Sequence, residues 1–307
     1  MTLSTTRPAL RALHRAPFYW RPGTSLLVQH RCYVASANAP RARKPPPPEA
    51  PKSKEEALEL MGRVRWLQDS GTADVNSMEV ELSDLHIPTM FAKKSGAGLF
   101  DHLTQLSKNV RNRFHNMISM YYMAKAQSVP GIKVKSPFSP QLFFSHSTRS
   151  TSWLAPFRKG ALESYLQLNE AIAARDTKKI RSLSTGSMVQ EYNKIIHSQD
   201  PRYSQVWRFH GERTPCQVVS LRARDSFVGS RQPEHGSTLL VQALVRFDTL
   251  QSVETRLNKT GALVSQSEVR PVVEYLVFQK RMWQYTPWVI RDRLYEGLET
   301  KVSTVGL

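Results

Sequence analysis

Positively charged side chains, spaced as on a helix surface, are the groups in this sequence best placed to do chemistry. Lys108, Arg111 and Arg113 fall within about one and a half turns if residues 98–126 are helical. Such a cluster can hold phosphate groups, and each contact to a nucleic acid releases condensed counterions. The spacing therefore predicts a cationic surface that contacts the phosphates of RNA or of an anionic membrane.

The excess of positive charge continues on both sides of this helix. Residues 93–135 hold eight Lys or Arg against a single acid, Asp101, for a net charge of +7. The candidate RNA or membrane contacts are Lys93, Lys94, Lys108, Arg111, Arg113, Lys125, Lys133 and Lys135. The full chain of 307 residues carries a formal charge of +18, which favours an anionic partner, with an acidic protein as a further possibility.

Residues 98–126 must position these cations, and they show the clearest helical pattern in the chain. Apolar residues recur at spacings of three and four, at Leu99, Leu103, Leu106, Val110, Phe114, Met117, Tyr121 and Ala124. One interpretation packs this stripe against the protein's own core and leaves the cations in solvent. The alternatives place the helix on RNA or flat on a membrane surface. No apolar run approaches the roughly 20 residues of a transmembrane helix.

The N-terminal region has the composition of a targeting segment. Residues 1–48 contain seven Arg, one Lys and no Asp or Glu, which is typical of a mitochondrial transit peptide. Arg31 stands at the spacing of matrix processing sites, so we expect a transit peptide at 1–33 and a mature protein that starts at Val34. An ordinary basic tail is the alternative. Residues 34–97 are predicted to form a Pro-rich, basic extended arm shaped by a partner, with a short helix at 55–68.

A compact α+β domain is predicted at 156–297. Three helices are expected. The first spans 159–175, the second begins after the capping residue Asp176, and the third begins with a capping-box pattern at Ser187 and reaches about His197. Strands are expected at 207–209, 216–223 and 239–250. Residues 98–155 then form a long basic helix and loop, and 298–307 a tail. This order of helices before a mostly antiparallel sheet is typical of the α+β class.

The domain is predicted to close with a hairpin of two central strands. Residues 272–280 alternate as a strand should, and Pro287 ends a turn before the second strand. We expect Trp288, Ile290 and Leu294 to point to the same side of the sheet. Trp288 is then buried against the opening helices of the domain.

Several segments of this domain resemble the Tim-forty-four-like domain family. They are Ala-Leu-Glu-Ser-Tyr at 161–165, Leu-Asn-Glu-Ala-Ile-Ala-Ala-Arg-Asp at 168–176, Ile-Arg-Ser-Leu at 180–183, Val-Phe-Gln-Lys at 277–280 and Trp-Val-Ile at 288–290. The resemblance covers roughly 98–297 and implies the cone-shaped fold of the nuclear-transport-factor-two superfamily. With the transit peptide and the basic arm, it is closest to mitochondrial large-subunit ribosomal proteins of the L-forty-five type. Fungal relatives of that type are inner-membrane ribosome receptors near the tunnel exit.

The resemblance implies a structural role in the mitochondrial matrix, with rRNA, ribosomal proteins and the inner membrane as partners. A peripheral adaptor of the import or insertion machinery is the alternative, although the long charged coiled coil of the import-motor tether is missing here. Cone domains can also host enzymes, so His197, Asp200, His210 and Asp248 are the acid or base candidates. Their sequence context matches no catalytic motif, and two cysteines, Cys32 and Cys216, cannot form a metal cluster. We therefore expect a non-enzyme without cofactor or metal.

Overall fold

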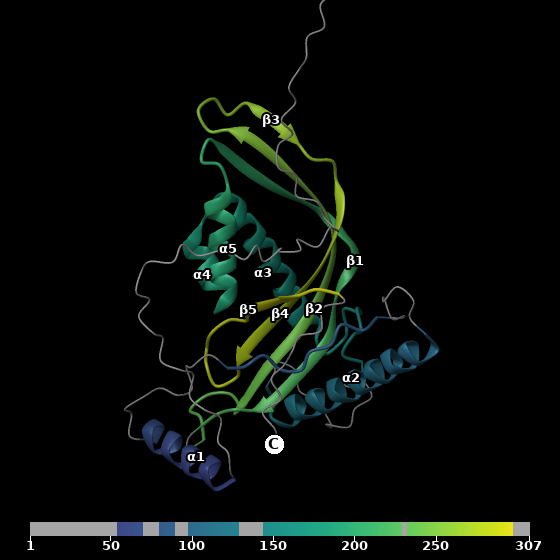
Figure 1. Ribbon diagram of the computed structural model, residues 1–307, viewed down its shortest axis with the longest axis vertical. Coiled ribbons are helices and arrows are strands. Elements are labelled where there is room, and N and C mark those ends of the chain that lie inside the picture. Colours follow the sequence, from purple (N-terminus) through teal and green to yellow (C-terminus); the bar gives the residue numbers. More distant parts are fainter. Residues whose placement is uncertain (1–53, 70–79, 90–97, 129–143, 229–231, 297–307) are drawn as a thin grey trace, which may run out of the picture. The chain divides into compact units, whose positions relative to one another are not determined.

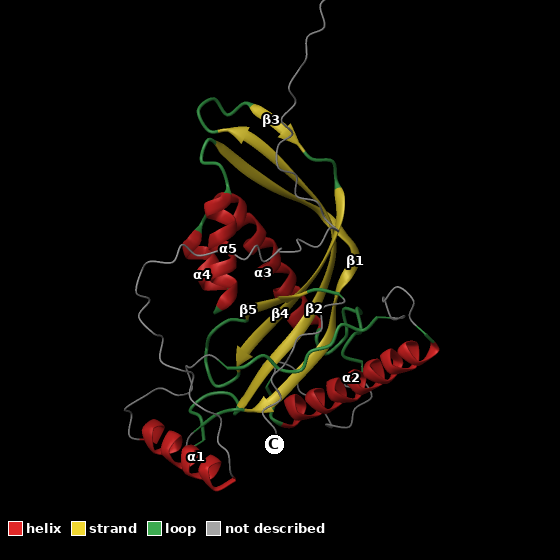
Figure 2. Ribbon diagram, in the orientation of Figure 1, coloured by secondary structure: helices red, strands yellow, loops and turns green. Residues whose placement is uncertain are grey.

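The protein has an α+β fold in which helices come first and an open antiparallel sheet follows (Figure 2). The computed structural model describes residues 54–69, 80–89, 98–128, 144–228 and 232–296. The helices are α1 (Lys54–Asp69), α2 (Leu99–Lys125), α3 (Ala155–Ala174), α4 (Thr177–Leu183) and α5 (Ser187–Ser198). The strands are β1 (Tyr203–Asp225), β2 (Leu239–Leu257), β3 (Leu263–Gln266), β4 (Arg270–Arg281) and β5 (Val289–Leu294). The predicted fold class is confirmed at this level.

The strands pair in the order β1-β2-β4-β5, and β3 adds to the far end of β2 (Figure 1). The four pairings between named strands are antiparallel, and an isolated parallel bridge joins Ser184 to Ile290 of β5. The prediction that both strands of the terminal hairpin are central is wrong for β5, which lies at the end of this path. Its charged run Arg291, Asp292 and Arg293 is typical of an edge strand, because charge there discourages pairing with other chains.

β1 is one long strand where the sequence predicted two short ones. Its pairing with β2 runs from Tyr203 opposite Leu257 to Asp225 opposite Leu239, and the register shifts at four places. One shift lies between Phe209 and Gly211, and Gly211 has a φ of 128°, a conformation that glycine adopts without a steric penalty. Bulges of this kind bend a strand without ending it, so the apolar alternation is broken while the pairing continues.

The main core lies between the inner face of the sheet and helices α3, α4 and α5 (Figure 1). Tyr165 of α3 stacks on Phe247 of β2 with ring centroids 4.3 Å apart. Near the start of α3, Phe157 contacts both Phe278 of β4 and Trp288. These aromatic contacts hold α3 against the middle of the sheet.

A register shift in the β4–β5 pair overturns the predicted facing of β5. The shift lies between Val277 and Phe278 on β4. Ile290 consequently packs in the inner core, whereas Leu294 packs on the outer face of the sheet. Trp288 precedes the strand and is half-buried against the inner core, beside Phe157.

Local capping explains where two of the helices begin. Asp176 accepts hydrogen bonds from the backbone N–H groups of Lys178 and Lys179, so its predicted role as the N-cap of α4 is confirmed. The predicted capping box of α5 is wrong, because Gly186 is the N-cap and Ser187 is the first helical residue. A sequence pattern for a capping box needs the serine one position before the helix, and here the helix starts one residue early.

Candidate nucleic-acid interface

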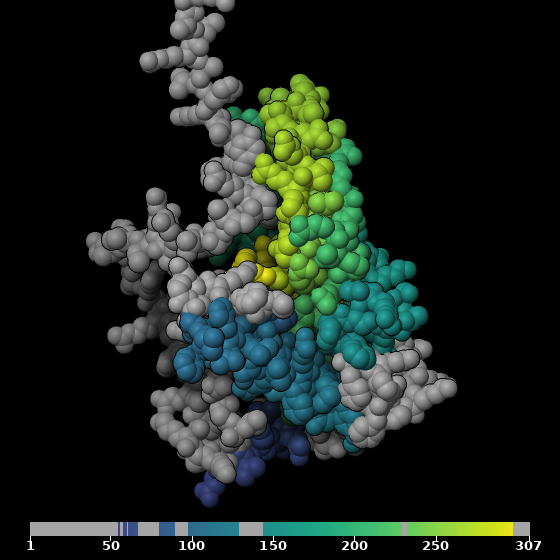
Figure 3. Space-filling view, turned by 90° about the vertical axis from the view of Figure 1, so that its right-hand side faces the viewer, coloured from purple at the N-terminus to yellow at the C-terminus, as the bar shows by residue number. Residues whose placement is uncertain are grey.

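The predicted contact residues that the structure describes all lie on α2. Lys108, Arg111, Arg113 and Lys125 are exposed to solvent along this helix. Figure 3 looks onto the side of the molecule where α2, in blue, forms part of the surface. Lys93, Lys94, Lys133 and Lys135 lie outside the described residues.

Helix geometry divides these cations between two sides of α2. At about 100° per residue, Lys108 and Arg111 lie about 60° apart, whereas Arg113 is roughly 160° from Arg111. The three positions are close in sequence, but only Lys108 and Arg111 can act together on one ligand surface. The prediction that all three cations form one compact patch is therefore wrong for Arg113, which lies on the other side of the helix.

A row of polar side chains docks α2 onto β1, at the edge of the sheet. Asn112 donates a hydrogen bond from Nδ2 to the carbonyl oxygen of Val219, at 2.9 Å. Asn116 accepts one at Oδ1 from the backbone N–H of Leu221, at 2.8 Å. Ser119 accepts another at Oγ from the backbone N–H of Ala223, at 3.1 Å. This polar row satisfies backbone groups that an edge strand otherwise leaves unpaired.

The spacing of the polar row is somewhat shorter than that of the strand it covers. Every second residue of an antiparallel strand offers its backbone to the same side, about 6.8 Å further along. On a helix, residues three or four apart on one face are separated by about 4.5 or 6 Å along the axis. Asn112 to Ser119 spans about 10.5 Å and Val219 to Ala223 about 13.6 Å, so the two rows differ by about 3 Å. Asn112 and Asn116 both reach the carbonyl oxygen of Val219, and these contacts hold the cations of α2 in a defined position.

A half-buried arginine of β1 reinforces this contact, and a histidine of α2 lies in its electrostatic field. Arg222 of β1 donates hydrogen bonds to the Oδ1 atoms of Asn112 and Asn116, at 2.9 and 3.0 Å. Burial lowers the pKa of Arg222 to about 10, which still leaves it charged at neutral pH. Burial also lowers the pKa of His115 on α2, and the nearby charges of Arg222 and Arg111 act in the same direction. The docked face of α2 thus favours a neutral His115.

Residues 80–89 pack on the outer face of the sheet and join it to α2. Leu85 is buried there among Val219, Leu244 and other apolar residues. The backbone N–H of Ser83 donates to Gln242 Oε1 at 2.7 Å. Asn109 of α2 donates to the carbonyl oxygen of Thr89 at 2.8 Å. The prediction that a partner shapes this part of the arm is wrong for 80–89, since the protein's own sheet does so.

From Leu99 to Phe114 the apolar stripe of α2 faces solvent, so the interpretation that packed it on the core is wrong there, whereas Met117 and Tyr121 are half-buried and Ala124 is buried in the core. Its residues Leu99, Leu103, Leu106, Val110 and Phe114 are between 52% and 74% exposed. The buried residues of the helix are Asn112, Asn116, Ser119, Met120, Met123 and Ala124. Hydrogen bonds to the sheet edge, together with Met120 and Met123, therefore decide which face of α2 is covered.

The four acid or base candidates do not form a site. His197 is exposed in the last turn of α5, and Asp200 pairs with Arg202 in the following turn. His210 contacts Ser252 Oγ at 2.7 Å. Asp248 is bound by Arg213 and Arg246, at 2.8 and 2.9 Å. Each group has its own local partner or is solvated, and the structure does not bring the four together.

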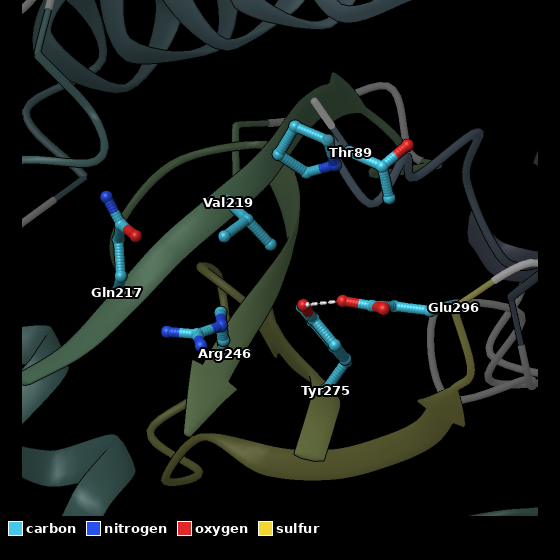
Figure 4. Close-up of a pocket in the computed structure, with 7 residues that line it drawn as sticks. Thr89, Gln217, Val219, Arg246, Tyr275 and Glu296 are labelled. Atoms are coloured by element: carbon cyan, nitrogen blue, oxygen red, sulfur yellow. Dashed lines mark hydrogen bonds between the residues drawn. The ribbon is translucent and has the colours of Figure 1, made fainter. Parts of the chain in front are cut away.

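One cavity of about 340 Å³ lies on the outer face of the sheet (Figure 4). Its lining residues are Pro88, Thr89, Gln217, Val219, Arg246, Tyr275 and Glu296. The Tyr275 hydroxyl donates a hydrogen bond to Glu296, and Arg246 is engaged by Asp248 and Thr214. The most polar groups of this cavity are thus occupied by protein partners, which makes it a poor site for a charged ligand.

A largely buried polar network lies on the inner face of the sheet and was not predicted from the sequence. Tyr165 donates a hydrogen bond to Glu274, and the Glu274 carboxylate lies 3.5 Å from the guanidinium of Arg293. Arg293 also lies over the ring of Tyr192. Burial raises the pKa of Tyr192 to about 12 and raises that of Tyr165 as well. The only sequence signal was a charged residue, Glu274, at an inward position of a strand.

In the described ranges, no helix combines the length and the hydrophobicity that crossing a bilayer requires. Among the same residues, no three His, Cys, Asp or Glu side chains are grouped so as to hold a metal ion. No protein-family model matches the chain, and a search of curated proteins finds no match either.

Proposed function

We propose that this protein is a structural, non-catalytic component of the mitochondrial large ribosomal subunit. It binds rRNA and helps to hold the tunnel exit at the inner membrane for mitochondrial translation and co-translational insertion. The observation that supports this best is the docked helix α2, which carries four exposed Lys or Arg and the single acid Asp101. A rigid cationic helix on a chain of net charge +18 suits a phosphate backbone.

The remaining parts of the proposal come from the sequence. The acid-free residues 1–48 support import into the matrix. The segments that resemble the Tim-forty-four-like family support a cone-shaped domain of the nuclear-transport-factor-two type and a ribosomal role. The separation of His197, Asp200, His210 and Asp248 supports a role without a catalytic step.

The rRNA proposal is tested by removing charge from α2 alone. In the variant Lys108→Gln, Arg111→Gln, Arg113→Gln, helix propensity is nearly unchanged because Lys, Arg and Gln are similar helix formers. Binding to isolated large subunits should weaken. The slope of the logarithm of the binding constant against the logarithm of salt concentration should become less steep by about one per lost phosphate contact. Sedimentation of subunits over a series of salt concentrations measures both quantities.

A matched control removes the same charge elsewhere. The variant Lys178→Gln, Lys179→Gln, Arg181→Gln takes three cations from α4, which lies against α3 and α5. It should bind subunits as the unchanged protein does. Equal losses in the two variants would show that only net charge matters, and no loss in the α2 variant would refute the rRNA role of this helix.

The alternative function is a peripheral inner-membrane adaptor of the import or insertion machinery, and α1 favours it. Leu58, Met61 and Trp66 are exposed on this helix, together with Arg63 and Arg65 in its second half, while its acids Glu55, Glu56, Glu59 and Asp69 lie nearer its two ends. Exposed aliphatic and Trp side chains beside cations are typical of a helix that lies in a membrane interface. If vesicles of phosphatidylcholine and phosphatidylserine bind the protein through Trp66 while subunits do not bind it, the adaptor replaces the ribosomal role.

A further inference from the structure

The exposed apolar residues of α2 form a continuous surface that the fold does not use. We call Leu99, Leu103, Leu106, Val110 and Phe114 the α2 stripe. It runs for about four turns, or about 22 Å along the helix axis. Every member is more than half exposed, whereas the polar row on another face of the helix makes the contacts to β1. Exposed apolar surfaces of this kind usually mark an interaction site.

The width of the α2 stripe favours a second helix as its occupant. At about 100° per residue, its five positions fall within about 80° of the helix circumference. Their spacing of 4, 3, 4 and 4 residues is close to the narrow seam along which two helices pack, whereas an interfacial membrane helix presents a broader apolar face. Phe100, which is 84% exposed, widens the apolar surface to about 120° only in the first turn. Four of the five side chains are aliphatic and only Phe114 could stack on a base, so the stripe suits an apolar helix better than RNA.

The charges beside the stripe specify the partner. Arg113 borders one side, about 20° from Leu106, and Arg111 borders the other, about 60° from Phe114. The one acid of the helix, Asp101, is used at the N-terminus, where it accepts a hydrogen bond from the backbone N–H of Gly98. Two copies of α2 would bring like charges together, which disfavours self-pairing. Carboxylates on both borders of the partner helix would complement these arginines.

We propose that the α2 stripe docks an amphipathic helix of another protein, one whose aliphatic seam is bordered by Asp or Glu. The apolar stripe takes no part in the rRNA role, whereas Arg111 and Arg113 on its borders belong to both proposals. The polar row leaves the stripe facing away from the sheet, so a partner helix can lie along it without displacing any contact of the fold. Leu103, Leu106 and Val110 form the centre of the surface.

Two synthetic helical peptides test this proposal on the full-length protein. Both carry the same leucine seam, one with Glu and the other with Lys at the bordering positions. Fluorescence anisotropy should show that the Glu peptide binds and that the Lys peptide binds at least about tenfold more weakly. The variant Leu103→Gln, Leu106→Gln should lose roughly tenfold or more in affinity for the Glu peptide, because each leucine loses the free energy of apolar burial.

The matched control changes two apolar side chains of equal exposure on another element. Leu263→Gln, Val264→Gln alters β3, where these residues are 56% and 54% exposed, and should leave peptide affinity unchanged. Equal unfolding temperatures of the two variants exclude a folding defect. If the Glu and Lys peptides bind equally, or if the stripe variant binds the Glu peptide normally, the proposal is wrong.

Two other occupants have distinct signatures that would also overturn the proposal. A dimer of the unchanged protein in sedimentation equilibrium, lost in the stripe variant, would identify a second copy as the occupant. Binding to phosphatidylcholine–phosphatidylserine vesicles that the stripe variant loses, with no peptide binding, would identify a bilayer. Failure of the rRNA proposal is distinguishable from failure of this one. The rRNA proposal is tested by subunit binding of the Lys108, Arg111, Arg113 variant, whereas this proposal is tested by peptide binding of the stripe variant.

Discussion

Asn116 of α2 accepts a hydrogen bond at Oδ1 from the backbone N–H of Leu221 in β1, at 2.8 Å, across 105 positions of sequence. Its Nδ2 atom donates to the carbonyl oxygen of Val219 at 3.3 Å. One amide side chain therefore serves both kinds of backbone group on the edge of the sheet. This contact explains why the most apolar side of α2 is not the side that packs.

Replacing Asn116 should weaken the docking of the whole helix. In Asn116→Ala the buried N–H of Leu221 loses its acceptor, which costs about 1–3 kcal/mol of unfolding free energy. Urea unfolding measures this loss, and hydrogen exchange should become faster at the Leu221 amide. Ser107→Ala, on an exposed position of the same helix, is the control and should change neither quantity. An unaltered exchange rate at Leu221 would contradict the docking role.

The stability of the folded protein should depend on pH through His115. Burial, Arg222 and Arg111 lower its pKa in the folded state, while Asp84 acts weakly in the opposite direction. The unfolded chain binds a proton near the ordinary pKa of about 6.5. A neutral His115 therefore makes its full contribution to the free energy of unfolding above that pH. This contribution is lost as the pH falls through the lower, folded-state pKa.

Comparison with His115→Gln isolates this effect. The unfolding free energy of the unchanged protein, relative to that of His115→Gln, should be constant above about pH 7 and should decrease as the pH falls towards 5, because Gln does not titrate. Ser107→Ala, which changes no titratable group at an exposed position of the same helix, is the control and should leave the pH profile unchanged. A constant difference between His115→Gln and the unchanged protein across this range would rule out the linkage.

Trp288 should contribute to stability through its contact with α3. Its ring lies 4.4 Å from that of Phe157, and the side chain is half-buried. Trp288→Ala should therefore cost about 2 kcal/mol, from partial apolar burial and one aromatic pair. Tyr285→Ala, at a side chain that is 84% exposed, provides the comparison. Thermal unfolding that is equal for both variants would show that the Phe157 contact contributes nothing.

Glu274 should matter mainly as the partner of Arg293. In Glu274→Gln the size of the side chain is kept, but the buried guanidinium loses its counter-charge, at a cost of about 3–5 kcal/mol. Adding Arg293→Met should restore part of the lost stability, since an apolar replacement of a buried pair is often neutral. Denaturant unfolding of the single and double variants measures this coupling. Additive losses would mean that the two residues do not act as a pair.

Local patterns in the sequence determined the types of the elements and their order. Asp176 caps α4 because an acidic side chain can accept hydrogen bonds from the N–H groups that follow it, whatever the rest of the fold does. The alternating residues of β4 likewise mark a strand, and both signals lie within a few residues of the chain. The α+β class followed from them.

The tertiary structure decided which surfaces are covered. Periodicity identified the apolar stripe of α2, but it could not show that Asn112 and Asn116 meet Val219 and Leu221 more than 100 positions away. The same holds for Leu85, which is buried because distant strands supply its neighbours, and for Leu294, whose side of the sheet depends on a bulge in the β4–β5 pairing. The unpaired backbone groups of an edge strand favour contact with the polar face of a helix over contact with its apolar face. Which face is covered is therefore decided only when both elements are in place.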